Sequence, residues 1–401
     1  MLKWLSDILS RRVFEPMYKP LTLKLATLLM VFPQIVETIY SPALVDIAQS
    51  FRVPPNMAGQ TLSCYFVAFA FGVAFWGRLS DLIGRRPTLL AGLSLYAFAS
   101  ILALFCRDFS TLLLARILAA FGAAVGSVIT QVAMRDLFSP QKLTQAYATI
   151  GVAIALSPAF GVLMGSELTQ KYGYQGVFLA LALLALVLLG YSAYSMPETR
   201  PLEMNKIPVK QVALWMMRDS QIRHITVLIA AFNISLFSYY QLAPFMLKIL
   251  QAPSQLLGYS GGVIAVGVLV GSVLNRHWVK KKYAFNRIML IAGLIQGVGS
   301  LGVYVLQESL LFIIPMAWVS LAYALAIPHL LAHALVHYKA CAGTASALLG
   351  FSYYTLLGLG LIITSFIQNI GIVLLITSVL IGFFFISFMK QPKKVSHHHI
   401  S

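Results

Sequence analysis

The sequence has few charged residues. Only 10% of its 401 residues are Asp, Glu, Lys or Arg, whereas soluble domains carry about 25%. A surface so poor in charge cannot face water on all sides, so the composition excludes a chain built of ordinary soluble domains. Hydrophobic residues make up 59% of the chain, which predicts an integral membrane protein with little mass outside the bilayer.

Cysteines and catalytic motifs are also scarce. Cys64, Cys106 and Cys341 fall in or beside apolar runs, without the spacing of a metal site or a disulfide framework, so we expect small buried side chains. We find no phosphate-binding loop, no nucleophile–base set and no metal cluster. The sequence therefore predicts no enzyme, no metal and no cofactor. Because no ATP-binding motif is present, any energy that the protein uses should come from an ion gradient.

The hydrophobic residues gather in twelve continuous runs. Each is close to the roughly 20 residues that a helix needs to cross about 30 Å of hydrocarbon, and none alternates as a strand would. We predict an all-α membrane protein with twelve transmembrane helices in two six-helix bundles. The expected spans are 23–44, 57–76, 88–106, 112–133, 144–166, 175–196, 224–246, 257–275, 288–306, 310–336, 342–366 and 370–389.

Basic residues outnumber acidic ones, 29 against 12. In a soluble chain this excess would indicate a nucleic-acid partner. Here twenty-four of the 29 fall near the termini or in every second connection between spans, and the alternate connections hold only four. By the positive-inside rule the richer side is cytoplasmic. We therefore expect a lipid bilayer and no nucleic acid as partner, with both termini in the cytoplasm.

The longest polar stretch divides the chain into two halves. The predicted organisation is an N-terminal segment 1–22, a six-helix bundle 23–196, a cytoplasmic loop 197–223, a second bundle 224–389 and a tail 390–401. Each half has a basic inner loop between its second and third spans, at 77–87 and at 276–287. This repetition indicates two related bundles around a central path, as in alternating-access transporters, and we expect a monomer.

The loop 77–87 (GRLSDLIGRRP) carries the most specific motif. Its glycines permit a tight turn, Pro87 can start the next helix, and Asp81 can accept bonds from arginines or helix N-termini and so hold the two bundles together. The alternative is an ordinary basic hairpin. We predict that this loop and the two charged residues after the fourth span form a conformational gate. Its residues are Gly77, Asp81, Gly84, Arg85, Arg86, Arg135 and Asp136.

The whole loop resembles the signature loop of the major facilitator superfamily. Other segments are similar to the twelve-span drug:proton antiporters of the Bcr/CflA type, nearest to the branch of multidrug resistance protein D. These segments are 38–44 (TIYSPAL), 46–48 (DIA), 135–138 (RDLF), 196–201 (MPETRP) and 342–348 (AGTASAL). The resemblance spans essentially the whole chain and implies proton-driven export of small, often apolar compounds.

Two charged residues lie inside the predicted spans. Arg116 is placed roughly 6 Å and Glu37 roughly 10 Å from the outer end of its span, so the two can pair directly or through water. A carboxyl group that faces each side in turn can load and release a proton. Alternatively, Arg116 is a structural charge bonded to backbone carbonyls, and Glu37 is a hydrogen-bonded residue near the interface.

The same resemblance assigns proton coupling to Arg116, because Arg116 and Gly122 match the family's fourth-helix motif, although Ala119 replaces the usual glutamine. In many relatives the acid lies one position later, where this chain has Thr38. The fifth span resembles the antiporter helix motif, with Ser157 where the family has glycine, and its alternative role is packing alone. The residues of that motif are Gly151, Pro158, Gly161 and Gly165.

Polar and aromatic residues within the spans predict a substrate cavity. A mostly apolar pocket with few polar groups suits amphipathic cargo, although each tyrosine can equally be a packing residue. The candidates are Gln34, Glu37, Tyr65, Gln131, Asn233, Tyr239, Tyr240, Tyr323 and Tyr353. His329 and His333 lie one turn apart and can assist proton transfer or have no role.

These inferences predict a proton-coupled exporter of small molecules in a bacterial inner membrane. One alternative keeps the fold but makes the cargo a single metabolite, such as a siderophore or a sugar. Another is a sensor with a transporter fold that moves nothing.

Overall fold

The computed structural model describes residues 21–200, 208–253, 255–338 and 341–390, and throughout these ranges the chain contains helices and no strand. The N-terminal half holds α2 (Leu23–Ile39), η1 (Ser41–Ala43), α3 (Leu44–Ser50), α4 (Pro55–Ile83), α5 (Arg85–Phe105), α6 (Phe109–Leu137) and α7 (Pro140–Ser195). The C-terminal half holds α8 (Val209–Arg218), α9 (Ser220–Ile249), α10 (Gln255–Lys280), α11 (Phe285–Leu306), η2 (Leu310–Phe312), α12 (Ile313–Ala334), α13 (Ala342–Ile367) and α14 (Ile370–Met389). Apart from residues 21, 22 and 390, the expected N-terminal segment and tail lie outside the described residues.

The predicted twelve crossings are confirmed. Eleven helices in the described ranges are long and apolar enough to cross a membrane. One of them, α7, contains two crossings, because the chain turns at Gly173, whose φ of 65° and ψ of −167° are not helical. The turn is tied to α3 by the Tyr174 amide, which donates to Asp46 Oδ2 at 2.6 Å.

The first predicted span ends differently from the expectation. Its helix stops at Ile39, passes through the short η1 segment that contains Pro42, and continues as α3. Proline cannot donate to a helix ladder and its ring clashes with the preceding turn, so Pro42 gives the break its cause. The break places Ser41 and Asp46 at the outer end of the bundle, where both make contacts between elements.

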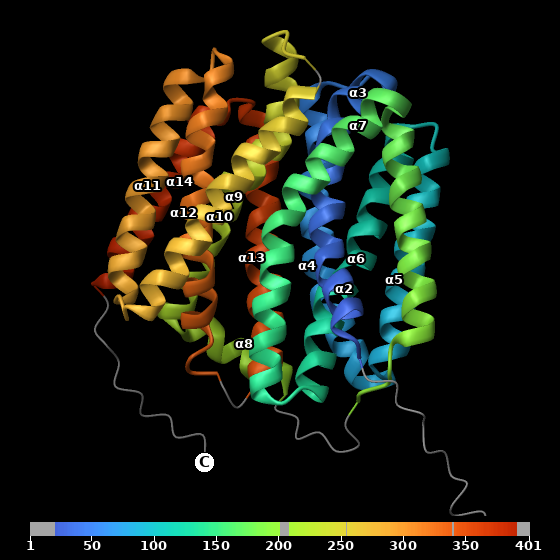
Figure 1. Cartoon of the computed structure of the whole chain (residues 1–401), viewed down its shortest axis with the longest axis vertical. Coiled ribbons are helices and arrows are strands. Elements are labelled where there is room, and N and C mark those ends of the chain that lie inside the picture. The colour runs from blue at the N-terminus through green and yellow to red at the C-terminus, as the bar shows by residue number, and fades with distance from the viewer. Residues whose placement is uncertain (1–20, 201–207, 254, 339–340, 391–401) are drawn as a thin grey trace, which may run out of the picture.

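The helices form two groups that lie side by side (Figure 1). In that view α2 to α7 lie to the right and α9 to α14 to the left, with α4 packed on α13 and α7 packed on α10 between them. We call the end that holds Gly84 and α8 the inner end, because the connections there carry most of the basic residues. The opposite end, with α3 and Gly173, is the outer end.

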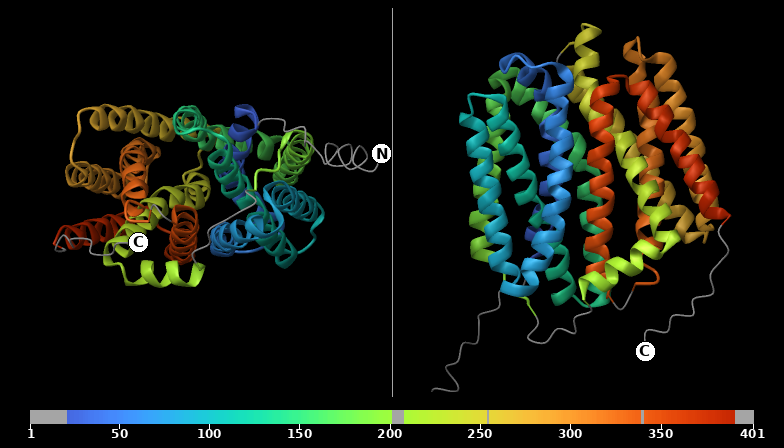
Figure 2. Two further views of the ribbon diagram at one scale, coloured as in Figure 1. Left: turned by 90° about the horizontal axis from the view of Figure 1, so that it is seen from below. Right: turned by 180° about the vertical axis from the view of Figure 1, so that it is seen from behind.

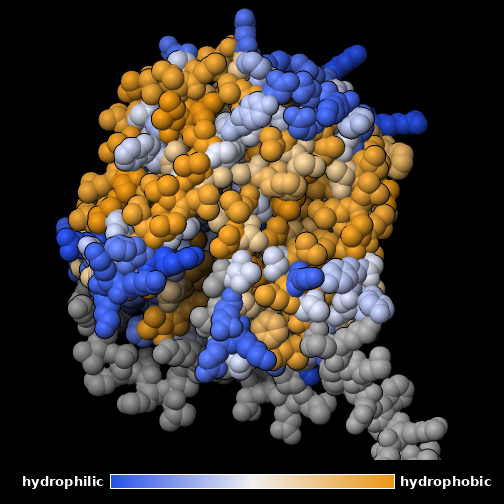
Figure 3. All heavy atoms as spheres, viewed as in Figure 1, coloured by the Kyte–Doolittle hydropathy of each residue, from blue (hydrophilic) through white to orange (hydrophobic). Residues whose placement is uncertain are grey.

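The segment 197–223, expected as a loop, contains the whole of α8 and the first residues of α9. Seen from below, α8 runs across the inner end at the edge of the molecule (Figure 2). The side of the molecule between the two ends is mostly hydrophobic, and hydrophilic residues gather toward the ends (Figure 3). This distribution fits a protein whose middle faces lipid.

Candidate functional site

A cavity of about 160 Å³ lies between the two halves. Helix α2 contributes Gln34 and Glu37, and the C-terminal half supplies the remaining walls. Those walls are formed by Ile229, Asn233, Phe237, Tyr323, Ile327, Leu331, Tyr353 and Tyr354. Because α2 belongs to one half and α9, α12 and α13 to the other, any cargo in the cavity touches both halves at once.

Glu37 is the one acidic or basic side chain among the residues that line this cavity. Its side chain is 1% exposed, and its Oε1 atom is buried without a hydrogen-bond partner. Thr38 points elsewhere, because a side chain added at Gly161 of α7 would collide with the Thr38 hydroxyl. One residue turns a helix position by about 100°, so in this chain it is position 37, not 38, that brings an acid to the cavity.

Arg116 lies on α6 between two aromatic rings. Its guanidinium carbon is 3.8 Å from the ring centre of Tyr40 and 4.5 Å from that of Tyr65. The side chain is 1% exposed, and its Nε and Nη2 atoms have no hydrogen-bond partner in the described chain. Such stacking stabilises a desolvated cation by about 2 kcal/mol.

Glu37 and Arg116 do not form a direct ion pair: the described residues contain three ion pairs, and this is not one of them. The arginine is stacked behind Tyr40 and Tyr65, neither of which lines the cavity. A direct pair, which the sequence allowed, is therefore not what the structure contains. The Glu37 carboxyl group thus lines the cavity without a direct ion pair.

Contacts between the halves close the outer side of the site. The Ser41 hydroxyl donates to the Tyr240 carbonyl at 2.5 Å. The Gln241 amide, fully buried, donates across the halves to the Gly59 carbonyl and within its own half to the Leu361 carbonyl, both at 3.1 Å. Sequence reasoning missed Gln241, although an uncharged amide inside a predicted span is a signal for such a bridge.

Not every predicted cavity residue lines the cavity. Gln34, Glu37, Asn233, Tyr323 and Tyr353 do. Four others do not. Tyr65 stacks on Arg116, Tyr239 donates its hydroxyl to Ser260, Tyr240 is buried beside Tyr239, and Gln131 is half-buried on α6.

The fifth-span glycines serve close packing of α7 on α2. Side chains added at Gly161 or Gly165 would collide with the end of α2, at Thr38 and at the Ile39 backbone. A side chain added at Gly151 would meet nothing within 4 Å. Pro158 lies half-buried between these positions. The structure thus separates one open glycine from two that the packing requires.

We expect Gly165→Ala to lower the thermal unfolding midpoint of the purified protein, because overpacking a tight contact costs about 1–3 kcal/mol. Gly151→Ala provides the matched control and should leave the midpoint unchanged or slightly higher, because alanine favours a helix more than glycine does. The measurement is thermal unfolding in detergent, followed by circular dichroism. Equal shifts for the two variants would contradict the assignment of Gly165 to the α2–α7 contact.

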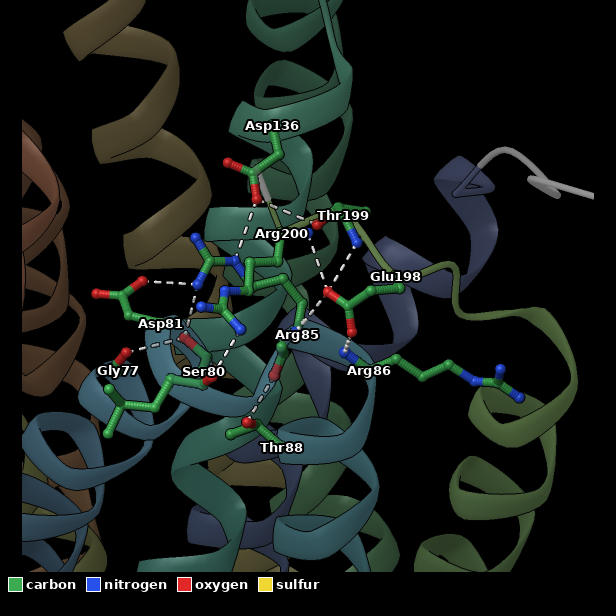
Figure 4. A network of polar contacts seen from close by, with 12 residues as sticks. Gly77, Ser80, Asp81, Arg85, Arg86, Thr88, Asp136, Glu198, Thr199 and Arg200 are labelled. Carbon is green, nitrogen blue, oxygen red and sulfur yellow. Dashed lines mark hydrogen bonds and ion pairs between the residues drawn. The ribbon is translucent and has the colours of Figure 1, made fainter. Parts of the chain in front are cut away.

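The signature loop is held by a polar network at the inner end (Figure 4). Arg85, 2% exposed, is at its centre. Its guanidinium pairs with Asp81 at 2.6 Å and with Asp136 of α6 at 3.2 Å. Arg135 beside Asp136 is exposed. The pair after the fourth span therefore contributes its acid, and not its arginine, to this network.

The structure corrects three expectations for this loop. Asp81 pairs with Arg85 of its own half, so its described contacts do not join the two bundles. Gly77 lies inside α4, and the turn is made by Gly84 alone, whose φ of 106° favours glycine. Helix α5 begins at Arg85, two residues before Pro87.

Glu198 completes the network and was not singled out from the sequence. Its carboxylate accepts the backbone amides of Arg85 at 2.8 Å and Arg86 at 3.1 Å, where α5 begins. It also accepts the amides of Thr199 and Arg200. The first amides of a helix lack partners within the helix, and a carboxylate there is favoured by the helix dipole. Glu198 thus ties the end of α7 to the start of α5.

We expect Glu198→Ala to destabilise the protein by about 1–3 kcal/mol, because it leaves these amides without their acceptor. The matched control is Glu308→Ala, which removes an exposed acid at the outer end. Thermal unfolding in detergent should show a lower midpoint for the first variant only. An unchanged midpoint for Glu198→Ala would show that water replaces the carboxylate at little cost.

The two histidines of α12 contact different neighbours. His329 Nε2 lies 2.6 Å from Asn275 Oδ1 of α10, and His333 stacks on Phe285 of α11 with ring centres 4.3 Å apart. Neither residue lines the cavity. Their contacts favour a packing role over proton transfer.

Three relatives of this chain are transport or drug-resistance proteins, and two of them match more than three quarters of it. An "Uncharacterized transporter" of Rickettsia bellii is 30% identical over 348 residues, 80% of this chain and 84% of the relative. A chloramphenicol resistance protein of Pseudomonas aeruginosa is 28% identical over 77% of this chain and 75% of its own length. Multidrug resistance protein D of Escherichia coli is 29% identical over 45% of this chain and 46% of its own length.

The fold also matches solved transporters. The xylose transporter XylE from E. coli, in a partially occluded inward open conformation, aligns with a TM-score of 0.74 at 14% identity, over 93% of this chain and 97% of that one. The family model of the Major Facilitator Superfamily matches residues 26–360. The family and these relatives are membrane transporters, not enzymes, and the resemblance found in the sequence is confirmed. This chain belongs to the Major Facilitator Superfamily.

Proposed function

We propose that this protein exports small amphipathic or apolar compounds in exchange for protons, by alternating access across a bacterial inner membrane, with both termini in the cytoplasm. One observation carries the proposal: the single acid of the cavity, Glu37, is buried with an oxygen that has no partner. A buried unpartnered carboxyl oxygen is costly, and a group kept at that cost in a transport cavity is a candidate for the proton site.

Competition at Glu37 would couple the two fluxes. With the cavity open to the inner side, cargo enters as Glu37 releases its proton. After the halves rock to open the outer side, a proton binds Glu37, cargo leaves, and the protonated site returns inward. Because both ligands need the same group, one proton entering drives one cargo molecule out, as reciprocal coupling between two ligands requires.

The state of the structure is consistent with loading from the inside. Ser41 and Gln241 close the outer side, and the close α7–α10 contacts at Gly258 and Gly261 lie in the outer half of these helices. The cavity of about 160 Å³ is smaller than the roughly 300–1,000 Å³ of sites for drug-sized ligands. The halves must therefore separate further at the inner side before a drug-sized molecule can enter.

The cavity walls favour neutral or singly cationic cargo with aromatic or aliphatic surface. Phe237, Tyr353 and Tyr354 offer ring faces, and Gln34 and Asn233 offer amide groups for orientation. No lysine or arginine lines the cavity in the described chain, so an anionic group would enter without a counter-charge. This chemistry supports a broad drug cargo over an acidic metabolite.

Transport in proteoliposomes tests the proposal. We expect an inward proton gradient to drive ethidium, a lipophilic cation, or chloramphenicol, a neutral drug, against its concentration gradient, and an ionophore that collapses the pH difference to stop it. Failure to move any cationic dye or apolar drug would overturn the export of a broad range of compounds and leave a transporter dedicated to one metabolite. Transport that ignores the pH difference would overturn proton coupling.

A further inference from the structure

Helix α8, between the two halves, has a surface that no described part of the chain covers. Val212 and Met216, one turn apart, are buried against the hydrophobic cluster at the inner ends of α9 and α13. On the outward surface, Met217 is 71% and Leu214 46% exposed. Large apolar side chains left exposed on an amphipathic helix indicate a partner of its own.

Basic residues share this exposed face. At 100° per residue, Lys210 falls between Leu214 and Met217 around the helix, and Arg218 lies next to Leu214. Both basic residues are exposed. Neither takes part in the three ion pairs of the described chain. The exposed face of α8 therefore carries apolar and positively charged side chains next to one another.

Asp219, the acid that directly follows α8, is already engaged. Asp219 Oδ1 accepts the Gln221 amide at the start of α9, and its Oδ2 accepts the Tyr338 hydroxyl at 3.1 Å. Burial and the Asp219 carboxylate raise the pKa of Tyr338, so this phenol remains a donor. These bonds fix the end of α8 to α9 and to the α12–α13 connection, and among the described residues Lys210 and Arg218 have no ion-pair partner.

The position of α8 matches the level of a membrane surface. It runs across the inner end of the C-terminal half, at the edge of the molecule (Figure 2), and it contacts α9 and α13. Those two helices are membrane spans that begin at this end, Ser220 for α9 and Ala342 for α13. A helix beside the ends of two spans lies where headgroups meet acyl chains.

We propose that α8 lies in the surface of the bilayer at its inner side and binds anionic phospholipids. Leu214 and Met217 enter the acyl boundary, and Lys210 and Arg218 extend to the phosphate groups, as basic side chains do at interfaces. Cytoplasmic leaflets are anionic and attract basic segments close to the membrane. A soluble protein partner would have to match both the apolar and the charged residues, whereas an anionic lipid surface offers both features at once.

The test uses the full chain with its three cysteines replaced by serine and a bimane label on Met217→Cys. The protein is reconstituted in phosphatidylcholine bilayers that contain phosphatidylglycerol. We expect dibrominated phosphatidylglycerol to quench the label more strongly than dibrominated phosphatidylcholine does. A label on Lys282→Cys, in the turn between α10 and α11, should be quenched much less by either lipid.

A charge variant separates lipid recognition from simple proximity. In Lys210→Gln/Arg218→Gln the preference for phosphatidylglycerol should disappear, because each basic residue near an anionic surface strengthens binding by about fivefold. The control Lys280→Gln/Lys281→Gln removes equal charge at the same end and should keep the preference. An equal loss in both variants would overturn a specific role of α8. A Met217 label that neither lipid quenches would overturn the membrane position itself.

Discussion

Replacing Glu37 with glutamine is expected to abolish export driven by a pH gradient. Glutamine keeps the shape and hydrogen-bonding capacity of a protonated carboxyl group but cannot release a proton. For one-to-one exchange, a pH difference of one unit sustains about a tenfold concentration ratio of cargo. Proteoliposomes with the Glu37→Gln variant should reach a ratio near one, at any imposed pH difference, where the unaltered protein approaches tenfold.

The matched control for this prediction is Glu167→Gln. Glu167 is a half-exposed acid of α7 near the outer turn at Gly173, paired with Lys171 at 3.4 Å. Its replacement removes the same charge without touching the cavity, so gradient-driven accumulation should persist. Normal accumulation by Glu37→Gln would remove Glu37 from proton coupling and leave it as a buried polar residue.

Replacing Arg116 with methionine is expected to stop export with little loss of stability. The variant removes the stacking on Tyr40 and Tyr65, about 2 kcal/mol, but it also ends the burial of a charge whose Nε and Nη2 atoms lack partners. Because these effects oppose each other, unfolding should change by no more than about 1 kcal/mol. Export should fall to the background of empty liposomes, since the cavity acid then loses its nearby counter-charge.

Thermal unfolding and dye export, measured on the same preparation, check this prediction. The control is Arg107→Met, an exposed arginine just before α6, which should retain both properties. If Arg116 were only a structural charge, its replacement would destabilise the protein strongly. Retained export together with a large loss of stability would therefore support that alternative.

Much of the fold follows from the sequence, because a helix in lipid needs a long apolar run and little else. The runs located all twelve crossings, including the two that α7 joins across Gly173. Their ends were less certain, because helices extend beyond the hydrocarbon: α4 continues to Ile83 and includes Gly77. The break before α3 could not be predicted from composition, because it depends on where Pro42 lies relative to the neighbouring helices.

The site was only partly predictable for a physical reason. A polar residue in a span must avoid lipid, which marks Asn233 and Tyr239 alike as interior residues. Which interior surface each one faces depends on its neighbours: Asn233 lines the cavity, whereas Tyr239 bonds to Ser260 within the C-terminal half. Apolar walls such as Ile229 and Leu331 carry no signal at all, because their side chains would be equally suited to lipid.

The inner network shows the same limit across sequence distance. Local spacing revealed Asp81 and Arg85, which lie four residues apart on either side of the turn at Gly84. Glu198 caps α5 at Arg85 from 113 residues further along the chain, and no local pattern announces that contact. Only the packing of the end of α7 against the start of α5 brings its carboxylate to those amides.

Proton release on cargo binding tests most directly whether the proton and the cargo compete for Glu37. The purified protein is mixed with ethidium in weakly buffered detergent solution that contains a pH indicator, near the pH at which half of the protein has Glu37 protonated. We predict that dye binding releases protons, with the yield rising toward about one per bound dye as pH falls, and that Glu37→Gln, which is fixed in the neutral form, binds dye weakly and releases no protons. Dye binding without proton release by the unaltered protein, or equal release by Glu37→Gln, would contradict competition at Glu37.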